Sequence, residues 1–496
     1  MRVALSLILS AAVSVSAFSQ NVVQRFDAYC QKTFEEWNVP AMSVVVVKDG
    51  EVAYLKGFGV TKADGSGRPV DPETTQFVLA STTKAFTGAL LATVVDQGDV
   101  RWEDPVKVHL PDFRMYDPWV TDHMMVGEVN SHHNGWKEYA MDDLPFFGYD
   151  RDGLYGLFAA IRPSCDFRTE YAYNNEMYTV SAKIIEKYTG MSWDDAMAER
   201  IFKPLGMSHS TTGAKAYRTS PDLAYGYRVH YDPDGDRMWL EPRDDREDAF
   251  TWLSAVAPAA FVMTTASDMA SWLKLHLGHG VFEGDTLIPR ANHDYLFKPQ
   301  TVSAFSDSLI RTYGQGWGVE QNSKVRYIRH TGLGYGYTSL VGLVPELNLG
   351  FAFMSTNGTT SNSLEGMGQK LIDMYLGIDG EDYALVNLEK YKDSKRVSSP
   401  EDKPVEVKEP TLPLSKYVGR YAQEQFGQAS VTLEDDALHF RLRKVDSVLK
   451  HVTGDTFSFH VDGAGHFDLT FKVEGGVSKS LTFDIGDPIC DLVRVR

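Results

Sequence analysis

Cysteine is scarce in this sequence, and its few copies stand far apart. The 496 residues contain three cysteines, namely Cys30, Cys165 and Cys490. An odd, widely spaced set of this kind is not a disulfide framework, which excludes a small scaffold that depends on several bridges. One bridge can form if the protein is exported, and the sequence does not choose the pair.

Positive charge is also in short supply. Lysine and arginine together number 49 and aspartate and glutamate 67, which leaves a net charge of −18. Because this excess repels nucleic acids and anionic membrane surfaces, we expect neither as a partner. No apolar run of about 18 residues follows the N-terminal segment, so no membrane span is expected either. The sequence does not indicate an oligomeric state.

Three familiar catalytic motifs are missing. The chain has no Gly-x-Ser-x-Gly, no His-Glu-x-x-His and no Gly-x-x-x-x-Gly-Lys-Ser/Thr pattern. Their absence argues against ordinary α/β-hydrolases, zinc peptidases and P-loop enzymes. His132 and His133 are adjacent rather than four residues apart, so we interpret them as structural rather than as a metal pair.

An acidic stretch in the middle of the chain is interpreted as a solvated loop. The rest of a calcium-loop pattern is absent around it, so it does not predict a calcium site. We therefore expect neither a metal nor a cofactor. The aspartates concerned are Asp142, Asp143, Asp150 and Asp152.

The N-terminus has the pattern of a signal peptide over residues 1–20. Arg2 is followed by a mostly apolar run to about Val15, and small residues then precede a cleavage point near Ala17–Gln20. This order of charge, apolar run and small residues is typical of export. We expect a secreted or periplasmic protein.

Hydrophobic periodicity predicts an α/β domain over residues 21–388. A β-branched run at 41–47 ends at the hairpin signal Asp49-Gly50. Helical spacing follows at 82–95, 177–188 and 265–277, and strand patterns return at 317–320, 325–329, 339–345 and 350–355. Strands, a mostly helical and loop middle and strands again indicate a sheet that joins both ends of the segment.

The composition changes after residue 388. Residues 389–411 are charged and contain proline with few large apolar side chains, which predicts a linker. Residues 412–496 show short alternating runs separated by turn signals such as Gly475-Gly476. This spacing favours a small C-terminal β-barrel or sandwich.

The pattern Ser-x-x-Lys occurs three times, and context separates the copies. Ser447–Lys450 lies in the β-rich tail, where a three-residue offset does not put two side chains on one face. Ser271 lies inside an amphipathic helix. Ser81 lies where an apolar segment passes into a helix, so that Lys84 is one turn on and on the same face. A helix N-terminus also offers free N–H groups to a developing oxyanion, although an N-capping role for Ser81 is the simpler alternative.

Three motifs in a fixed order favour a catalytic role for Ser81 over an N-capping role. They are Ser81-Thr82-Thr83-Lys84, Tyr173-Asn174-Asn175 and His330-Thr331-Gly332. Together with their flanking segments they resemble the serine β-lactamase and penicillin-binding-protein-like family, specifically its class C β-lactamase-like branch, over about residues 21–375. The resemblance implies an antiparallel sheet with a helical subdomain. It also implies that the C-terminal barrel is the lipocalin-like domain that some members carry.

The resemblance also implies roles for the matched residues. Ser81 is the expected nucleophile, and Lys84 and Tyr173 are the candidate base pair, because a serine hydroxyl needs a neighbouring base. An ammonium beside the phenol would lower the pKa of Tyr173 and burial would lower that of Lys84, so the choice between them stays open. Asn175 is expected to orient Lys84 and bind a substrate carbonyl. The backbone N–H groups of Ser81 and Leu333 form the implied oxyanion hole.

The third motif departs from class C β-lactamases, which have lysine where this chain has His330. Histidine is mostly neutral near pH 7, so it lacks the fixed cation that suits a substrate carboxylate. His330, Thr331 and Gly332 are expected to bind and orient substrate, and the His-Thr-Gly form is similar to that of family members acting as D-amino-acid peptidases, carboxypeptidases or esterases.

These observations predict an exported serine hydrolase that forms an acyl-enzyme on Ser81. Its substrate would be a small molecule or peptide that offers an ester, a D-amino-acid amide or a lactam carbonyl. Two alternatives remain: an acyltransferase using the same acyl-enzyme, and a non-catalytic ligand-binding protein on the same fold.

Overall fold

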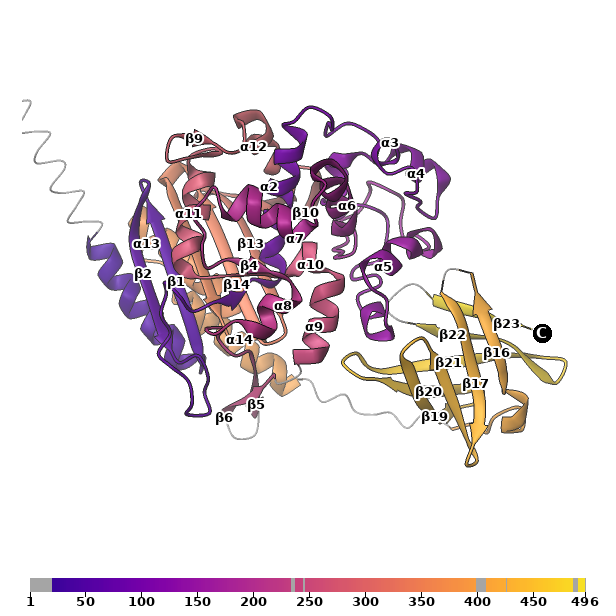
Figure 1. Ribbon diagram of the computed structural model, residues 1–496. Coiled ribbons are helices and arrows are strands. Elements are labelled where there is room, and N and C mark those ends of the chain that lie inside the picture. The colour runs from indigo at the N-terminus through magenta and orange to yellow at the C-terminus, as the bar shows by residue number, and fades with distance from the viewer. Residues whose placement is uncertain are drawn as a thin grey trace, which may run out of the picture.

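The structure is a computed structural model that describes residues 20–232, 237–243, 246–397, 407–424, 426–484 and 489–495 (Figure 1). The predicted signal peptide over 1–20 lies outside the described residues except for Gln20, which begins a helix over 20–36. Among the helices of the described ranges, none combines the length and the apolar character that a membrane span requires.

One antiparallel sheet forms the centre of the larger domain. Its strand order is β10-β11-β12-β13-β14-β15-β1-β2, so the N-terminal hairpin β1–β2 pairs with strands from the end of the domain. This closure confirms the predicted mixed α/β fold. The strands are β1 (Ala41–Lys48), β2 (Glu51–Gly59), β10 (Thr301–Ser306), β11 (Leu309–Tyr313), β12 (Gly318–Asn322), β13 (Arg326–Gly334), β14 (Tyr337–Val344) and β15 (Leu349–Ser355).

Both faces of this sheet are covered, which explains why β1 is a continuous apolar run rather than an alternating one. Val44 and Val46 pack into one core with the N-terminal helix and α13 (Asn362–Leu376). Val45 and Val47 point to the opposite face and join the larger core, which includes Trp272 of α11 (Ala266–Leu277). Because successive side chains of a strand point to opposite faces, this one segment contributes residues to both cores.

The helices predicted from periodicity are present at nearly the predicted bounds. Helix α2 (Thr83–Val95) is buried on all sides, and α6 (Tyr178–Thr189) ends at Gly190, whose φ of +67° suits a glycine after a helix. Thr265 caps α11 by accepting a hydrogen bond from the Asp268 backbone at 3.1 Å. The other helices are α3 (Val106–His109), α4 (Pro118–His123), α5 (Arg151–Leu157), α7 (Trp193–Met197), α8 (Gly213–Thr219), α9 (Arg246–Ala255), α10 (Ala257–Ala260), α12 (Arg290–Leu296) and α14 (Tyr383–Val397).

Small two- and three-stranded sheets complete the larger domain. One of them joins β3 to β7 and β4, and it leads the chain into the segment that carries Ser81. Their strands are β3 (Phe77–Val78), β4 (Thr211–Thr212), β5 (Tyr227–Asp232), β6 (Arg237–Pro242), β7 (Val262–Thr264), β8 (Val281–Phe282) and β9 (Asp285–Thr286).

The C-terminal region is a closed barrel, as predicted. Side chains alternate along its strands, so that Leu438, Phe440 and Leu442 are buried while their neighbours are more exposed. The strands, in order around the barrel, are β16 (Gly419–Gln423), β17 (Gly427–Glu434), β18 (Ala437–Leu442), β19 (Val445–Thr453), β20 (Thr456–Val461), β21 (Gly465–Glu474), β22 (Val477–Asp484) and β23 (Ile489–Val495).

The segment expected to be a linker differs in part from that expectation. Its first residues belong to α14, which continues to Val397, and residues 398–406 lie outside the described part of the chain. The charged composition of 389–397 therefore belongs to a helix. Its apolar residue Tyr391 is largely buried in the core on the α13 side of the sheet.

The barrel packs against the larger domain at the short helical turn η3 (Leu144–Phe147). The Phe147 ring is fully buried and lies 5.9 Å from that of Phe483 in a stacked arrangement, with Phe467 at 5.6 Å. Tyr149 donates a hydrogen bond to the Phe426 carbonyl at 2.7 Å. The apolar interior of the barrel and the core of the larger domain are thus continuous.

Candidate active site

Ser81 lies in a tight turn between a strand and a long helix. The chain leaves β3, forms the 3₁₀ turn η1 (Ala80–Thr82) and continues directly into α2. Ala80 has a φ of +47°, a left-handed conformation that costs a non-glycine residue free energy and is enriched at functional sites. This turn brings the half-buried Ser81 to the wall of a cleft.

Lys84 is wholly buried beside the serine, one turn into the helical segment. Its Nζ lies 3.3 Å from Ser81 Oγ, 2.6 Å from Asn175 Oδ1 and 3.1 Å from the Ala259 carbonyl oxygen. Burial lowers the pKa of Lys84 to about 7, against the opposing influence of the carboxyl groups of Asp142 and Glu176. Near neutral pH a large share of Lys84 is therefore uncharged.

The hydrogen-bond partners of Lys84 orient the lone pair of that neutral amine. A neutral amine has two N–H donors and one lone pair. Two of its three partners, Asn175 Oδ1 and the Ala259 carbonyl, can only accept hydrogen bonds. When both donors are used on them, the lone pair is left for the Ser81 hydroxyl. The arrangement can therefore take a proton from the serine.

Tyr173 lies on the other side of Ser81, with its hydroxyl hydrogen-bonded to that serine. Burial raises the pKa of Tyr173 well above its usual value, and the Ser81 hydrogen bond lowers it less. This differs from the expectation that a neighbouring ammonium would lower it. Lys84 Nζ lies over the ring face, 4.6 Å from the centroid. The phenol therefore keeps its proton at neutral pH.

The Asn175 amide is held between the lysine and a carboxylate. Its Nδ2 donates to both oxygens of Asp142 at 3.0 Å, which turns its oxygen toward Lys84. The interpretation of Asp142 as part of a solvated loop is wrong, because its side chain contacts this buried network at the edge of the cleft. Glu176, which follows directly in the chain, is fully buried and hydrogen-bonded to Asp142.

Strand β13 forms the opposite wall of the cleft. Its pairing with β12 ends at Arg329, so the edge from His330 onward faces the turn that carries Ser81. Gly332 passes so close that an added Cβ would lie 2.1 Å from the Leu79 carbonyl oxygen and 3.1 Å from the Ser81 nitrogen. Thr331 and the half-exposed Leu333 line the cavity. The absence of a side chain at Gly332 is what permits this contact.

His330 is a neutral, doubly hydrogen-bonded group in this structure. Its Nδ1 lies 2.6 Å from the Thr331 carbonyl oxygen, which can only accept, so Nδ1 carries the proton. Its Nε2 then accepts from the Tyr313 hydroxyl at 2.7 Å. Burial, with the positive charge of Lys84, lowers the pKa of His330 to about 3. His330 therefore offers no positive charge to a substrate.

The cleft at Ser81 has a volume of about 610 Å³ and a wall that combines aromatic with polar residues. Arg311 and Arg329, the cations in its lining, both lie within ion-pair distance of Glu320. Sequence reasoning did not single out most of these wall residues, because their motif-free segments give no signal before the chain folds. The aromatic residues are Tyr139, Tyr171, Tyr173, Trp252, Tyr313 and Tyr335.

His132, predicted to be structural, packs against the segment that carries Tyr173. Its Nδ1 accepts a hydrogen bond from the Asn174 backbone at 3.1 Å, and its ring lies 4.3 Å from that of Tyr173. Cys30 and Cys165 are free thiols, and the side chain of Cys490 lies outside the described atoms.

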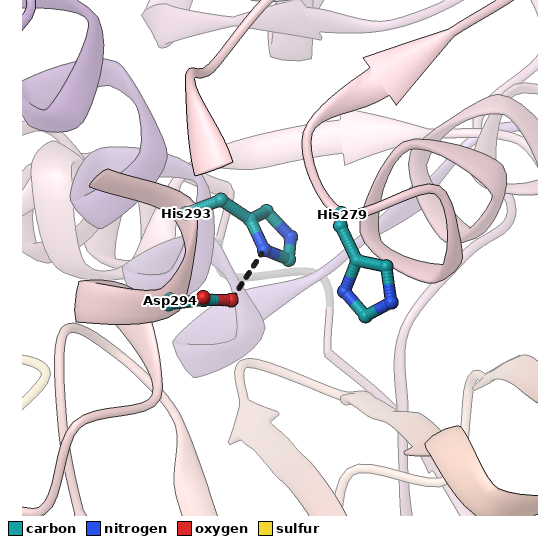
Figure 2. A group of neighbouring side chains, drawn as sticks. All are labelled: His279, His293 and Asp294. Carbon is teal, nitrogen blue, oxygen red and sulfur yellow. Dashed lines mark ion pairs between the residues drawn. The ribbon is translucent and has the colours of Figure 1, made fainter. Parts of the chain in front are cut away.

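One group of side chains in the described ranges has the composition of a metal site (Figure 2). His279, His293 and Asp294 offer ligand atoms within 4.8 Å of one another, and none of the three lines the Ser81 cleft. Arg290 Nε contacts both oxygens of Asp294, at 2.9 and 2.8 Å, and would compete with a cation for them. We assign no catalytic role to this group.

Comparison with known families divides the chain in two. The model of the beta-lactamase family matches residues 22–371, which is most of the chain and includes every residue of the cleft named above. A second family, described as a domain of unknown function (DUF3471), matches residues 403–492, the segment that forms most of the barrel.

Individual relatives match most of the chain. Unguisins hydrolase ungD' of Aspergillus campestris is 28% identical over 442 residues, covering 83% of this chain and 78% of the relative. Penicillin-binding protein 4 of Amycolatopsis lactamdurans is 27% identical over 363 residues, covering 72% of this chain and 90% of the relative. The structure of an octameric penicillin-binding protein homologue from Pyrococcus abyssi has a TM-score of 0.62 at 18% identity, covering 95% of this chain and 100% of the other, which shows a shared fold.

The family match, the hydrolase and penicillin-binding relatives and the fold lead to the same conclusion. The protein belongs to the beta-lactamase and penicillin-binding-protein-like family, as its motifs predicted, and is of the serine hydrolase type.

Proposed function

We propose that the protein hydrolyses an uncharged amide or ester through an acyl-enzyme on Ser81. The observation that carries this proposal is the contact between Ser81 Oγ and the buried amine of Lys84, whose two other partners are both acceptors. A serine hydroxyl reacts at a useful rate only when a base removes its proton. Neutral Lys84 is that base.

The two groups beside Ser81 divide the proton transfers between them. The Ser81 proton passes to Lys84 Nζ as Oγ bonds to the substrate carbonyl carbon. The leaving nitrogen or oxygen then takes a proton from the Tyr173 hydroxyl, which Lys84 restores. Water then attacks the acyl carbon and gives a proton to Lys84, and the bond from that carbon to Ser81 Oγ breaks as Oγ takes the proton back from Lys84. The protonated state of Tyr173 supports its assignment as the acid.

The oxyanion of each tetrahedral intermediate would be stabilised by backbone N–H groups. The Ser81 nitrogen lies at the start of a helical segment, and β13 passes directly against it at Gly332. We assign the N–H groups of Ser81 and Leu333 to this oxyanion hole. The loss of one such donor typically lowers the rate by about 10²–10³-fold.

The cleft favours a neutral, partly aromatic or apolar substrate. Its histidine is uncharged, and the two arginines of its wall already have carboxylate partners. A substrate carboxylate would find no fixed cation of the kind that lysine provides. Two relatives, named an unguisins hydrolase and a penicillin-binding protein, support a hydrolase-type reaction at Ser81. We further propose that the protein is exported, on the pattern of residues 1–20.

A substrate panel tests this proposal. Purified protein would be assayed on p-nitrophenyl esters, D-amino-acid amides, D-Ala-D-Ala peptides and nitrocefin. We expect turnover of neutral esters or amides and little of the anionic peptides and nitrocefin. Product analysis with an added amine or alcohol separates hydrolysis from acyl transfer. No turnover of any member by wild-type protein, with ligand binding that survives Ser81→Ala, would favour a non-catalytic binding protein.

A further inference from the structure

A pair of carboxyl groups lies directly behind the Lys84–Asn175 contact. Glu176 is fully buried, whereas Asp142 lines the cleft. The two side chains are hydrogen-bonded to each other. Two carboxylates cannot hydrogen-bond unless one of them holds a proton, so the pair carries one proton and one negative charge.

The surroundings decide which of the two holds the proton. Neither oxygen of Glu176 has a hydrogen bond of ordinary geometry from a donor in the described residues. Burial and the neighbouring Asp142 charge raise the pKa of Glu176 far above its usual value, against weaker effects of its own backbone and Lys84. Asp142 instead accepts both bonds from the Asn175 amide. Glu176 is therefore the donor and Asp142 the carboxylate.

We propose that Asp142 and Glu176 are positioning residues that act on Lys84 through Asn175. Glu176 donates a hydrogen bond to Asp142, and the negative charge on Asp142 fixes the Asn175 amide with its oxygen toward Lys84. This proposal rests on the proposed function. It goes beyond it by giving a role to two acidic residues that touch neither the nucleophile nor the lysine.

The consequence of this arrangement is a defined orientation for the lysine lone pair. An asparagine amide can rotate by half a turn and exchange its oxygen and nitrogen. Here the carboxylate accepts only from the nitrogen end, so the oxygen end stays 2.6 Å from Lys84 Nζ. With that acceptor fixed, the lone pair remains directed at Ser81. Asp142 is itself held, because Trp252 Nε1 donates to its backbone oxygen at 2.9 Å.

The other titratable groups around the network do not supply this negative charge. Lys84 also faces the rings of Tyr173 and Tyr178, whose phenols are held protonated by burial. His132 and His330 face it as well, and burial keeps both neutral. On the other side of Asp142 lie Tyr139 and Asp143, which interact with it only through charge.

The test is the pH dependence of ester hydrolysis in matched variants. In wild-type protein kcat/KM for p-nitrophenyl acetate should rise through the pKa of Lys84. In Asp142→Asn the lost charge lowers that pKa, so the rising limb should move to lower pH by about one pH unit, with a fall in kcat larger than any change in KM. Asp143→Asn removes the adjacent carboxyl and should leave the limb in place. An unmoved limb in Asp142→Asn would overturn the proposal.

Glu176 provides a second measurement that does not depend on the first. Glu176→Gln keeps a donor of the same shape, so its limb should stay at the wild-type position. Glu176→Met cannot donate, so the pKa of the buried Asp142 rises, part of its negative charge is lost and the limb should move to lower pH. Equal effects of the two substitutions would contradict a donor role. Fluorophosphonate labelling of Ser81 in each protein distinguishes failure of this inference from failure of the proposed function. If the wild-type protein is not labelled, the proposed function itself is overturned.

Discussion

Ser81 and Lys84 act as one unit because the two other hydrogen-bond partners of the lysine amine can only accept. A buried amine with a pKa of about 7 can act as a base under conditions where an exposed lysine is fully charged. That property is produced by burial, and the carboxyl groups behind it limit how far burial can lower the pKa. The catalytic capacity of the site therefore depends on groups that are hydrogen-bonded to neither Ser81 nor Lys84.

The protonation of Lys84 predicts the direction of the pH profile. Because the neutral amine is the active form, kcat/KM for a neutral ester should rise with pH and reach a plateau above about 7. The pKa of His330, about 3, adds no limb near neutrality. The measurement is initial rates on a p-nitrophenyl ester from about pH 5 to about pH 9. Lys84→Arg, which cannot deprotonate, serves as the control and should lose activity throughout. A flat wild-type profile would contradict the assignment of the base.

At the scale of single residues, motif order predicted which side chains meet at the cleft but not what surrounds them. Ser81, Lys84, Tyr173 and Asn175 come together although the last two are far from the first two in sequence. Asp142 was misinterpreted because an aspartate in a polar-looking stretch usually faces water. Only the folded chain shows that its partner is the amide of Asn175.

At the scale of elements, the approach of β13 to the Ser81 turn is the contact on which the cleft depends. Gly332→Ala would place a Cβ 2.1 Å from the Leu79 oxygen and 2.4 Å from Ser339 Oγ, so the strand must move away. A displacement of about 1 Å at such a site can lower activity by about 10²-fold. Kinetics on an ester substrate measure the loss.

The same strand supplies the matched control for that substitution. Gly334→Ala places its Cβ 3.9 Å from its nearest neighbour, the Ala80 Cβ, which is an ordinary contact. We expect near wild-type activity from it. If both alanine variants retained full activity, close approach at Gly332 would have no role in catalysis.

Periodicity predicted the strands and helices of both domains well because their apolar residues alternate or recur with one regular spacing. It missed the helical character of 389–397, whose charges outnumber the apolar side chains that bind it to the core. It also missed η3, since a single turn has no periodicity to detect. Tertiary contacts, rather than local pattern, decide such elements.

At the scale of the whole molecule, the barrel and the catalytic domain share a contact next to the active site. Phe147 enters the aromatic interior of the barrel only a few residues after Asp142. Phe147→Ala should reduce the free energy of unfolding by about 3–5 kcal/mol, the usual cost of removing a buried phenylalanine ring. Phe305→Ala, at a site 76% exposed, is the control and should change it little. Chemical denaturation measures both, and equal stabilities would show that the contact does not hold the domains together.

Intact-protein mass spectrometry after reaction with a fluorophosphonate probe shows whether Ser81 is the nucleophile, because the probe forms a covalent adduct with an activated serine. We predict a single adduct on wild-type protein, located by peptide mapping to the segment that contains Ser81, and none on Ser81→Ala. Labelling should also become faster as Lys84 loses its proton. An unlabelled wild-type protein, or an adduct that persists in folded Ser81→Ala, would contradict this role of Ser81.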